Sequence, residues 1–365
     1  MQATLSTQEL SKGLTIVSRA LSSRNQLPVL ANVLIQTRKN TVLLSATNLE
    51  VAIRTQVGGK VTTEGELTVP ARSLTEFVSS ISSSQVNLIG ESGKLKITAA
   101  KFQASFAGID AAEFPTLPQF TAAKSQSIPA TTLGQIATQV AYAAAVDESR
   151  PVLTGVKFQV LEGKLVVVAT DGFRLSRKII ANSPLGDLQS LILPAKTVQE
   201  LARIAGEEKS DVKMELVEKN NQVIFNLGNT DLISRVLEGN YPDTEKIIPT
   251  DFPVEVLVDR QEFSQGLKAA SIFAREDNNI VKFKISTGKL KIVAAAASQG
   301  ESEVEVEAEN QGEGEIAFNY KFVQEAVNSL AEERIKLQLK DHLSPGVFRL
   351  EKDSSLLALV MPVRI

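Results

Sequence analysis

The stretch Pro70-Ala71-Arg72-Ser73-Leu74-Thr75-Glu76-Phe77-Val78 decides the fold, because its pattern recurs at Pro194–Ala202 and again at Asn319–Val327. Each copy has a basic third residue, an apolar fifth residue, a Glu at the seventh position and apolar residues at the eighth and ninth. The copies begin about 124 residues apart, and about three such periods fill the chain. The sequence therefore predicts one structural unit repeated three times.

A second set of repeated motifs supports the first. Pro28-Val29-Leu30 precedes Ala46-Thr47-Asn48-Leu49, and Pro151-Val152-Leu153 precedes Ala169-Thr170-Asp171-Gly172 at the same distance. Turns followed by the start of a strand recur at Gly93–Ile97, Gly163–Val167 and Gly288–Ile292. Several matches in the same order favour duplication over chance. The third unit lacks a clear Pro-Val-Leu motif and is the most diverged.

Proline-containing segments mark the expected domain boundaries. Phe114–Pro118 closes the first unit and Ile248–Pro253 closes the second. We predict three similar domains at residues 1–122, 123–250 and 251–365. Both links are short, so we expect neighbouring domains to be held rigidly.

Hydrophobic spacing predicts the elements of each unit. One helix is expected near the N-terminus, capped by Ser6 or Thr7, and the repeated helix is expected to start with Pro70 at its first position. Apolar runs such as Thr41–Ser45 and Leu95–Thr98 predict strands. Each unit is expected to contain a helix, three or four strands, a second helix and three or four strands. Two helices packed on antiparallel sheets in each domain give the fold class α+β.

The composition excludes several classes of protein. The chain has no Cys, one His and a formal net charge of −3, so thiolate chemistry and a His-based metal cluster are excluded. No Gly-rich phosphate loop follows a strand, and we expect neither an enzyme nor a bound cofactor. The N-terminus has no signal-peptide pattern, and no apolar run reaches about 18 residues. We therefore expect a cytoplasmic protein without a membrane partner.

Lysines and arginines recur at fixed places on the expected helices. A cation in the first helical turn opposes the helix dipole at a cost of about 0.3–1 kcal/mol, and the repeated helix has one there three times. The ordinary explanation is an ion pair with the Glu four residues later, worth about 0.2–0.5 kcal/mol. For the whole set we favour a shared basic surface that holds phosphates without reading sequence. Its members are Lys12, Arg19, Arg72, Lys196, Arg203, Lys268, Arg275 and Lys321.

Duplex DNA is the polyanion that fits this surface best. The aromatic content is 5% and there is no Trp, which disfavours single strands bound by base stacking. Helices pack about 8–10 Å apart, so six helices in a circle leave almost no opening, whereas twelve leave about 24 Å. A ring around duplex DNA therefore needs two chains, joined head to tail between the first unit of one and the third unit of the other.

Three motifs are similar to those of a known family. Val168–Leu175, Asn240–Asp243 and the C-terminal Val360–Ile365 resemble the bacterial DNA polymerase III beta subunits, the sliding clamps, and the resemblance covers the whole chain. It implies the DNA-clamp architecture, a head-to-tail homodimeric ring of similar domains around duplex DNA. It also implies that linear motifs link the clamp to the replicative polymerase alpha subunit, the clamp loader, other polymerases and repair proteins.

The family has a pocket between its second and third domains for short motifs with Leu and Phe anchors. Phe173 and Lys246 depart from the His and Arg that are common at these positions, which leaves the motif preference open. Carried over by position, the pocket consists of Leu153, Thr170, Gly172, Phe173, Arg174, Leu175, Pro242, Lys246, Ile247, Asn319, Phe322, Val347, Val360, Met361, Pro362, Val363 and Arg364.

The resemblance also implies contacts with a second chain and with DNA. The strand Lys101–Phe106 would pair edge to edge with a strand of the third unit of another copy. Arg24 and Arg150 would touch DNA. The apolar contacts between chains would be Phe106, Ile272 and Phe273, although ordinary domain core explains these three residues equally well.

Simpler explanations exist for each motif. Asp171-Gly172 is a strong turn signal, and its simplest role is a hairpin corner. Leu357–Met361 fits a final core strand. The strongest alternative function is a repeat-built scaffold that binds peptides or proteins and does not encircle DNA. Such a scaffold explains the triplication but not the repeated cations that oppose the helix dipoles.

Overall fold

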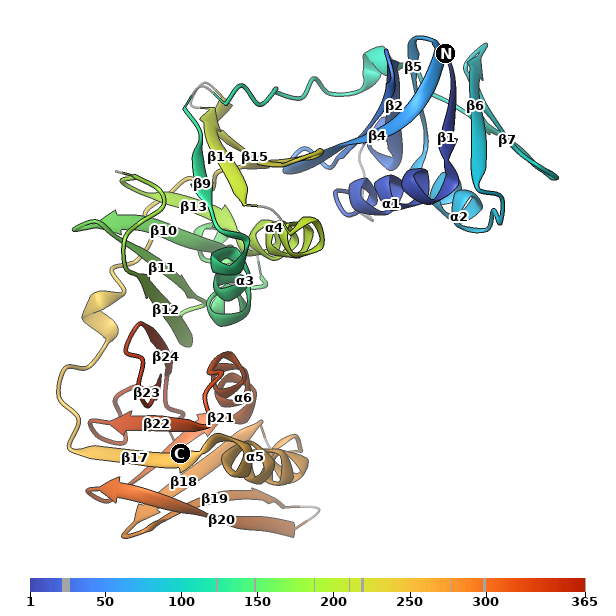
Figure 1. Cartoon of the computed structure of the whole chain (residues 1–365). Coiled ribbons are helices and arrows are strands. Elements are labelled where there is room, and N and C mark those ends of the chain that lie inside the picture. Colours follow the sequence, from blue (N-terminus) through green and yellow to red (C-terminus); the bar gives the residue numbers. More distant parts are fainter. Residues whose placement is uncertain are drawn as a thin grey trace. The chain divides into compact units, whose positions relative to one another are not determined.

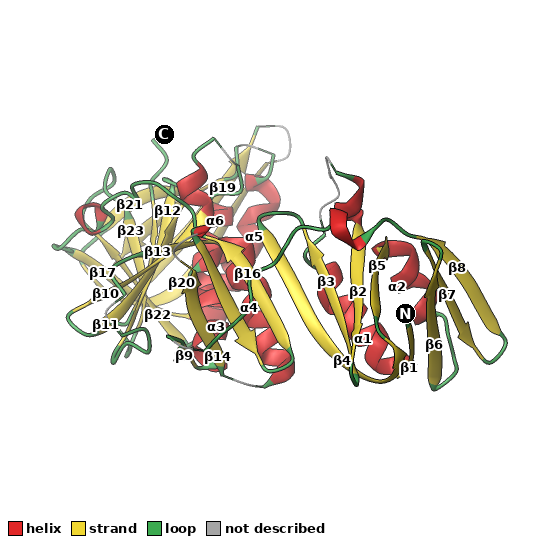
Figure 2. Ribbon diagram, turned by 90° about the horizontal axis from the view of Figure 1, so that it is seen from above, coloured by secondary structure: helices red, strands yellow, loops and turns green. Residues whose placement is uncertain are grey.

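The chain forms two compact units in a computed structural model. The first unit consists of Met1–Leu133 and Glu200–Val236, and the second of Gly134–Gln199 and Leu237–Ile365. Each unit contains one antiparallel sheet of twelve described strands (Figures 1 and 2). The structure describes residues 1–21, 27–122, 124–147, 149–186, 188–209, 211–217, 220–276, 278–297 and 300–364.

The strands and helices follow one order from end to end. The first repeat has β1 (Gln2–Ser6), α1 (Thr7–Ser18), β2 (Asn32–Arg38), β3 (Thr41–Thr47), β4 (Val51–Thr63), β5 (Gly65–Pro70), α2 (Ala71–Ser79), β6 (Gln85–Glu91), β7 (Lys94–Ala99) and β8 (Phe102–Ala107). The second has β9 (Gln126–Ile128), α3 (Ala130–Gln139), β10 (Gly155–Leu161), β11 (Lys164–Thr170), β12 (Arg174–Ile180), β13 (Leu191–Pro194), α4 (Ala195–Glu208), β14 (Val212–Val217), β15 (Gln222–Leu227) and β16 (Thr230–Arg235). The third has β17 (Val254–Asp259), α5 (Arg260–Ala274), β18 (Ile280–Ser286), β19 (Lys289–Ala296), β20 (Gly300–Gln311), β21 (Gly314–Asn319), α6 (Tyr320–Ser329), β22 (Arg334–Leu339), β23 (Gly346–Leu350) and β24 (Leu356–Val360).

Each repeat is therefore two copies of a strand, a helix and three strands. The prediction that a unit begins with a helix was wrong, because a short strand precedes every helix. In β1 only alternate residues, Ala3 and Leu5, are fully buried, so the strand adds little to the apolar pattern of α1. Pro70 is likewise the last residue of β5 and the N-cap of α2, not its first helical residue.

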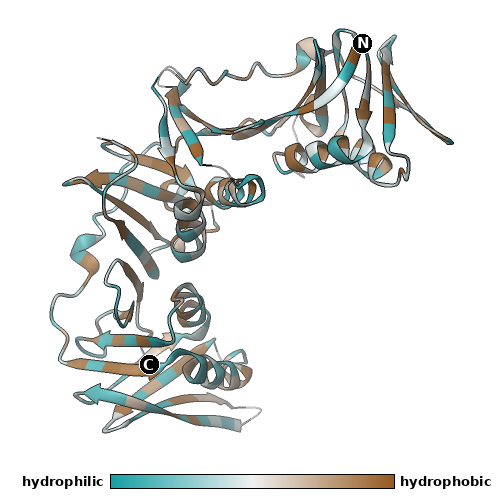
Figure 3. Cartoon of the chain, viewed as in Figure 1, coloured by the Kyte–Doolittle hydropathy of each residue, from teal (hydrophilic) through white to brown (hydrophobic). Residues whose placement is uncertain are grey.

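The predicted N-terminal helix is confirmed. Ser6 caps α1, and its Oγ accepts a hydrogen bond from the Glu9 N–H at 3.4 Å. Leu10, Leu14 and Val17 are fully buried along one face of the helix. In Figure 3 the same helix contains both hydrophobic and hydrophilic residues along its length. An amphipathic helix of this kind is stabilised mainly by packing on a sheet.

Strand β4 is long, with 13 residues, and pairs with three other strands of the first sheet. Its first half lies between β3 and β16, and its second half pairs with β1. Gly59 makes this close approach possible, because a Cβ there would lie 2.0 Å from Leu5 Cδ2. The sheet of the first repeat thus continues into strands of the second.

The same pairing joins the second and third repeats. Strand β12 of the second repeat pairs with β24 of the third, just as β4 of the first repeat pairs with β16 of the second. The equivalent strand of the third repeat is β20, whose residues 300–307 pair on one side with β19. The equivalent of β16 and β24 in the first repeat is β8, which pairs with β7. Within the described part of the chain, these two strands have open edges.

Helices cover one face of the sheet in each unit. In the first unit α1 packs beside α2, and in the second α5 packs beside α6. The core under α5 and α6 is rich in Phe, and the ring of Phe283 lies 5.5 Å from both Phe263 and Phe318. Among the described helices, none has the length and apolar character needed to cross a bilayer.

Candidate functional site

The turn between β11 and β12 forms the centre of the candidate site. Thr170 Oγ1 donates a hydrogen bond to the Arg174 carbonyl at 2.6 Å. Asp171 Oδ1 accepts from the N–H groups of Phe173 and Arg174 at 2.8 and 3.0 Å. Gly172 has a φ of 92°, which favours glycine. The hairpin corner is confirmed, and it leaves Phe173 exposed while Arg174 is buried.

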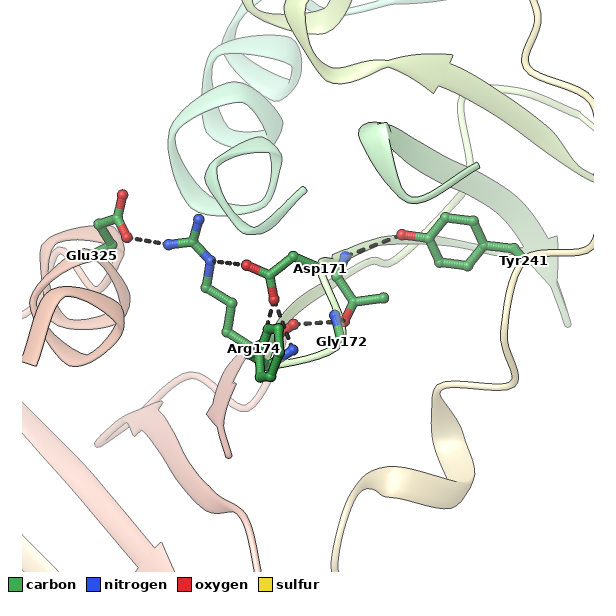
Figure 4. A network of polar contacts seen from close by, with 7 residues as sticks. Asp171, Gly172, Arg174, Tyr241 and Glu325 are labelled. Carbon is green, nitrogen blue, oxygen red and sulfur yellow. Dashed lines mark hydrogen bonds and ion pairs between the residues drawn. The ribbon is translucent and has the colours of Figure 1, made fainter. Parts of the chain in front are cut away.

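The side chain of Arg174 is held on several sides (Figure 4). Its Nε donates to Asp171 Oδ2 at 3.0 Å, and its Nη1 donates to the carboxylate of Glu325 on α6. The guanidinium carbon lies 4.9 Å from the ring centroid of Phe322 and 5.6 Å from that of Tyr142. Paired carboxylates and aromatic faces are the groups that stabilise a buried guanidinium.

Two half-buried tyrosines support the turn. Burial raises the pKa of Tyr142 and of Tyr241, so both stay neutral and keep their hydroxyl protons near neutral pH. The Tyr241 hydroxyl accepts a hydrogen bond from Thr170 N at 3.1 Å and donates to the Gly155 carbonyl at 3.3 Å. The link after β16 is thereby fixed against the turn.

Apolar residues form the floor beside the turn. Leu175, Val347 and Leu359 belong to one buried cluster, and Met361 packs against it. The Met361 N–H donates to the Phe173 carbonyl at 2.8 Å, which holds the start of the C-terminal tail next to the corner. The rings of Phe173 and Phe322 are stacked with centroids 6.5 Å apart.

A hollow of about 290 Å³ opens at this place. Sequence reasoning missed its wall at Ala144–Val146 and the supporting contacts of Tyr142 and Glu325. The repeated Glu at the seventh position was visible in the sequence, but its partner was not. The residues that line the hollow are Ala144, Ala145, Val146, Asp147, Ser149, Arg150, Asp171, Phe173, Arg174 and Phe322.

The structure brings together about half of the predicted pocket. Thr170, Gly172, Phe173, Arg174, Leu175, Phe322, Val347, Val360 and Met361 meet at the turn, the sheet and the first turn of α6. Leu153 is buried next to Arg150, and Asn319 caps α6 through the Lys321 N–H. Arg150, predicted to touch DNA, lines the hollow, with its Nη1 3.5 Å from the position of a Cβ on Gly172.

The remaining predicted pocket residues belong to two other segments, the link after β16 and the C-terminal tail. Pro242, Lys246 and Ile247 belong to the link before β17, where Lys246 pairs with Asp243 at 2.9 Å. Pro362 follows Met361 in the tail. Val363 and Arg364 line a separate hollow of about 310 Å³ that also includes His342.

The first repeat contains a backbone copy of the same turn. Thr47 Oγ1 donates to the Val51 carbonyl at 3.0 Å, and Asn48 Oδ1 accepts from the N–H groups of Glu50 and Val51. Here Glu50 and Val51 stand where Phe173 and Arg174 stand in the second repeat. The turn is therefore a property of the repeat, whereas the aromatic and guanidinium groups are specific to the second one.

Several of the predicted DNA-binding cations are ion-paired. Lys12 Nζ lies 2.9 Å from Glu208, and this hydrogen bond raises the pKa of the lysine. Arg19 lies 2.9 Å from Glu207, which is also 3.6 Å from Arg203. For Lys12 and Arg19 these carboxylates come from a helix distant in the sequence, so they are not the partners that the spacing predicts. The ordinary explanation holds for Arg203 and for Arg72, which lies 3.0 Å from Glu76, since each is paired with the Glu four residues later on the same helix.

Other predicted cations are exposed without a carboxylate partner. Lys196, Lys268 and Lys321 are exposed, and no carboxylate of the described residues lies within 4.0 Å of their ammonium groups. Arg275 donates to the Tyr320 hydroxyl at 3.1 Å. Arg24 lies outside the described residues.

The predicted contacts with a second chain are placed at the open strand edges and on α5. Phe106 lies on β8, and its ring contacts Phe77 with centroids 5.8 Å apart. Ile272 on α5 is 59% exposed, so domain core does not explain it. Phe273 is half-buried and packs against the core of the second unit.

Three α+β repeats, joined through continuous sheets, define a repeat-built protein of the DNA-clamp class. Family models for the DNA polymerase III beta subunit match the chain with the N-terminal domain at residues 1–118, the central domain at 127–243 and the C-terminal domain at 245–364. The chain belongs to the DNA polymerase III beta subunit family. It is 33% identical to a beta sliding clamp of Synechocystis sp., over 98% of this chain and 97% of the relative.

Solved sliding clamps have the same fold over the whole chain. The DNA polymerase sliding clamp of Bacillus subtilis has a TM-score of 0.95 at 27% identity, covering 100% of this chain and 99% of that chain. A Pseudomonas aeruginosa sliding clamp bound to griselimycin has a TM-score of 0.93 at 29% identity, with 100% of both chains covered. The family resemblance and the fold class inferred from the sequence are confirmed.

Proposed function

We propose that this protein is a DNA sliding clamp, a processivity factor that encircles duplex DNA and tethers the replicative polymerase. The observation that carries the proposal is the match of all three beta-subunit domain models, in order, along the chain. Its domains would be 1–122, 123–250 and 251–365. The clamp acts as an accessory subunit with no reaction of its own, and it holds DNA without reading sequence.

The strand pairing supports ring closure by a second copy. Repeats one and two are joined by β4 and β16, and repeats two and three by β12 and β24. The third pair of this series is β20 and β8, and within one chain each of these has an open edge. An open edge pairs readily with another strand. A head-to-tail homodimer therefore satisfies both edges, with Phe106, Ile272 and Phe273 as apolar contacts.

The hollow at the β11–β12 turn is the proposed site for linear motifs of polymerases, the clamp loader and repair proteins. Exposed Phe173 and half-buried Phe322 offer aromatic surface, and Met361, whose N–H donates to the Phe173 carbonyl, is an adaptable apolar group next to them. Arg174 supplies hydrogen-bond donors. Apolar surface with a few placed polar groups is typical of peptide-binding sites. The other residues predicted for this pocket would form its periphery.

The test measures both the mass of the protein in solution and its retention on DNA. Light scattering at micromolar concentration is expected to give twice the chain mass of 39.4 kDa. Protein loaded on circular duplex DNA is expected to stay bound at high salt and to be lost once the circle is cut, because a ring slides off free ends. A monomer that leaves circular and linear DNA equally fast would favour the open protein-binding scaffold.

The exposed lysines give a graded prediction for DNA binding. DNA affinity falls as salt rises, and a plot of log affinity against log salt steepens by about 0.9 for each phosphate contact. Replacing Lys196, Lys268 and Lys321 together by Gln is therefore expected to make this slope less steep by about 3. Affinity for a short duplex measured by fluorescence anisotropy at several salt concentrations checks this. The control is Lys12→Gln, which removes a cation already paired with Glu208 and is expected to change the slope little. An unchanged slope in the triple variant would contradict a basic lining.

A further inference from the structure

Glu325 does not line the hollow, but it contacts Arg174, the buried cation that does. The carboxylate on α6 accepts from Arg174 Nη1, while Asp171 accepts from Nε at 3.0 Å. The Arg174 side chain is 9% exposed, whereas that of Glu325 is 47% exposed. A guanidinium this far removed from water needs carboxylate partners, because its desolvation is otherwise too costly. The two acids therefore determine where the cation rests.

The contacts also fix the orientation of the guanidinium plane. The group is flat and has five N–H donors in a rigid arrangement. Carboxylates occupy its Nε and Nη1 positions, and the rings of Phe322 and Tyr142 lie 4.9 and 5.6 Å from its carbon. Among contacts between described residues, none uses Nη2. Since Arg174 lines the hollow, these N–H groups are left for an acceptor that enters it.

The three copies of the repeated Glu have different partners. Glu76 pairs with Arg72 one turn earlier on its own helix, at 3.0 Å. Glu200 lies 3.9 Å from Arg19, and only Glu325 pairs, within the described residues, with a cation that lines the hollow. Of the three repeated glutamates, the one in the third copy is thus the one that contacts the candidate site.

We propose that Glu325 is a positioning residue of the peptide site, which holds the Arg174 guanidinium so that its free N–H groups donate to oxygen acceptors of the bound peptide. The inference rests on the proposed function, because it requires a peptide in this hollow. Glu325 acts through Arg174 and does not itself touch the peptide. Carbonyl oxygens of the peptide main chain are the acceptors that every such segment offers.

A double-mutant cycle on the full-length protein tests this role. The probe is a fluorescein-labelled short peptide with Leu and Phe anchors, and the readouts are its Kd and dissociation rate. Glu325→Gln is expected to raise the Kd about threefold to tenfold, because a charge-assisted but half-exposed contact is lost. The change is expected mainly in the dissociation rate. In an Arg174→Gln background, Glu325→Gln is expected to have no further effect.

Glu76→Gln is the matched control, because it removes the equivalent carboxylate from the exposed face of α2 and is expected to leave the Kd unchanged. Glu325→Asp keeps the charge but shortens its reach, and we expect an intermediate Kd. The inference would be overturned if Glu325→Gln lowered peptide affinity equally with Arg174 present and with Arg174 replaced by Gln, or if Glu325→Gln left the Kd unchanged. Either result would leave the proposed peptide site itself intact. Failure of the unsubstituted protein to bind the peptide would overturn the peptide site and this inference together.

Discussion

Phe283→Ala is expected to lower the free energy of unfolding of the second unit by about 3–5 kcal/mol. The Phe283 side chain is fully buried in β18, with edge-on contacts to the rings of Phe263 and Phe318. Its truncation removes the burial of a large apolar surface and leaves a cavity that close-packed neighbours fill only in part. Calorimetry or urea unfolding, followed with a probe in the second unit, measures the loss.

The control for this experiment is an aromatic ring at the surface. Phe173 is 60% exposed, and Phe173→Ala is expected to change stability by less than about 1 kcal/mol. A loss below about 1 kcal/mol for Phe283→Ala would mean that the core of the second unit does not depend on the aromatic cluster.

The double substitution Met361→Ala with Pro362→Ala is expected to weaken a peptide with Leu and Phe anchors at least about thirtyfold. Met361 packs on the apolar floor formed by Leu175, Val347 and Leu359, so its truncation removes the edge against which an anchor would pack. The hydrogen bond from Met361 N to the Phe173 carbonyl involves only the main chain and is expected to persist. The fold is therefore expected to survive, which thermal unfolding verifies.

A residue of the separate hollow provides the comparison. Leu343 lines the hollow that contains His342 and was not predicted for the peptide pocket, and Leu343→Ala is expected to leave peptide affinity within about twofold. Fluorescence anisotropy with the same labelled peptide measures both variants. Wild-type affinity of the double variant would reject the assignment of Met361 to the peptide site.

The repeat, the helices and the fold class could be predicted from the sequence because they depend on local pattern. The spacing of Leu10, Leu14 and Val17 alone indicates α1, and the repeated Glu indicates three related helices. The strand before each helix was missed. In β5, only Leu67, Thr68 and Val69 are buried, and the strand runs directly into α2, so its pattern merges with that of the helix.

The site was predicted only in part, because its contacts join distant segments. The link between Arg174 and Glu325 spans 151 positions, and that between Lys12 and Glu208 spans 196. No local pattern reveals which Glu faces which cation. The sequence could therefore indicate that Lys12 and Lys196 are both basic helix residues, but not that the first is paired and the second exposed.

The strand pairs β4–β16 and β12–β24 have a consequence for cutting the chain. The segment matched by the central-domain model, residues 127–243, looks like a natural fragment to express alone. Excision would remove one of the two neighbours of β12 and of β16 and expose two rows of unsatisfied main-chain groups. Such a fragment would be prone to assemble into fibres or aggregates. The repeated unit of the sequence is thus smaller than the sheets it builds, because each sheet combines strands of two repeats.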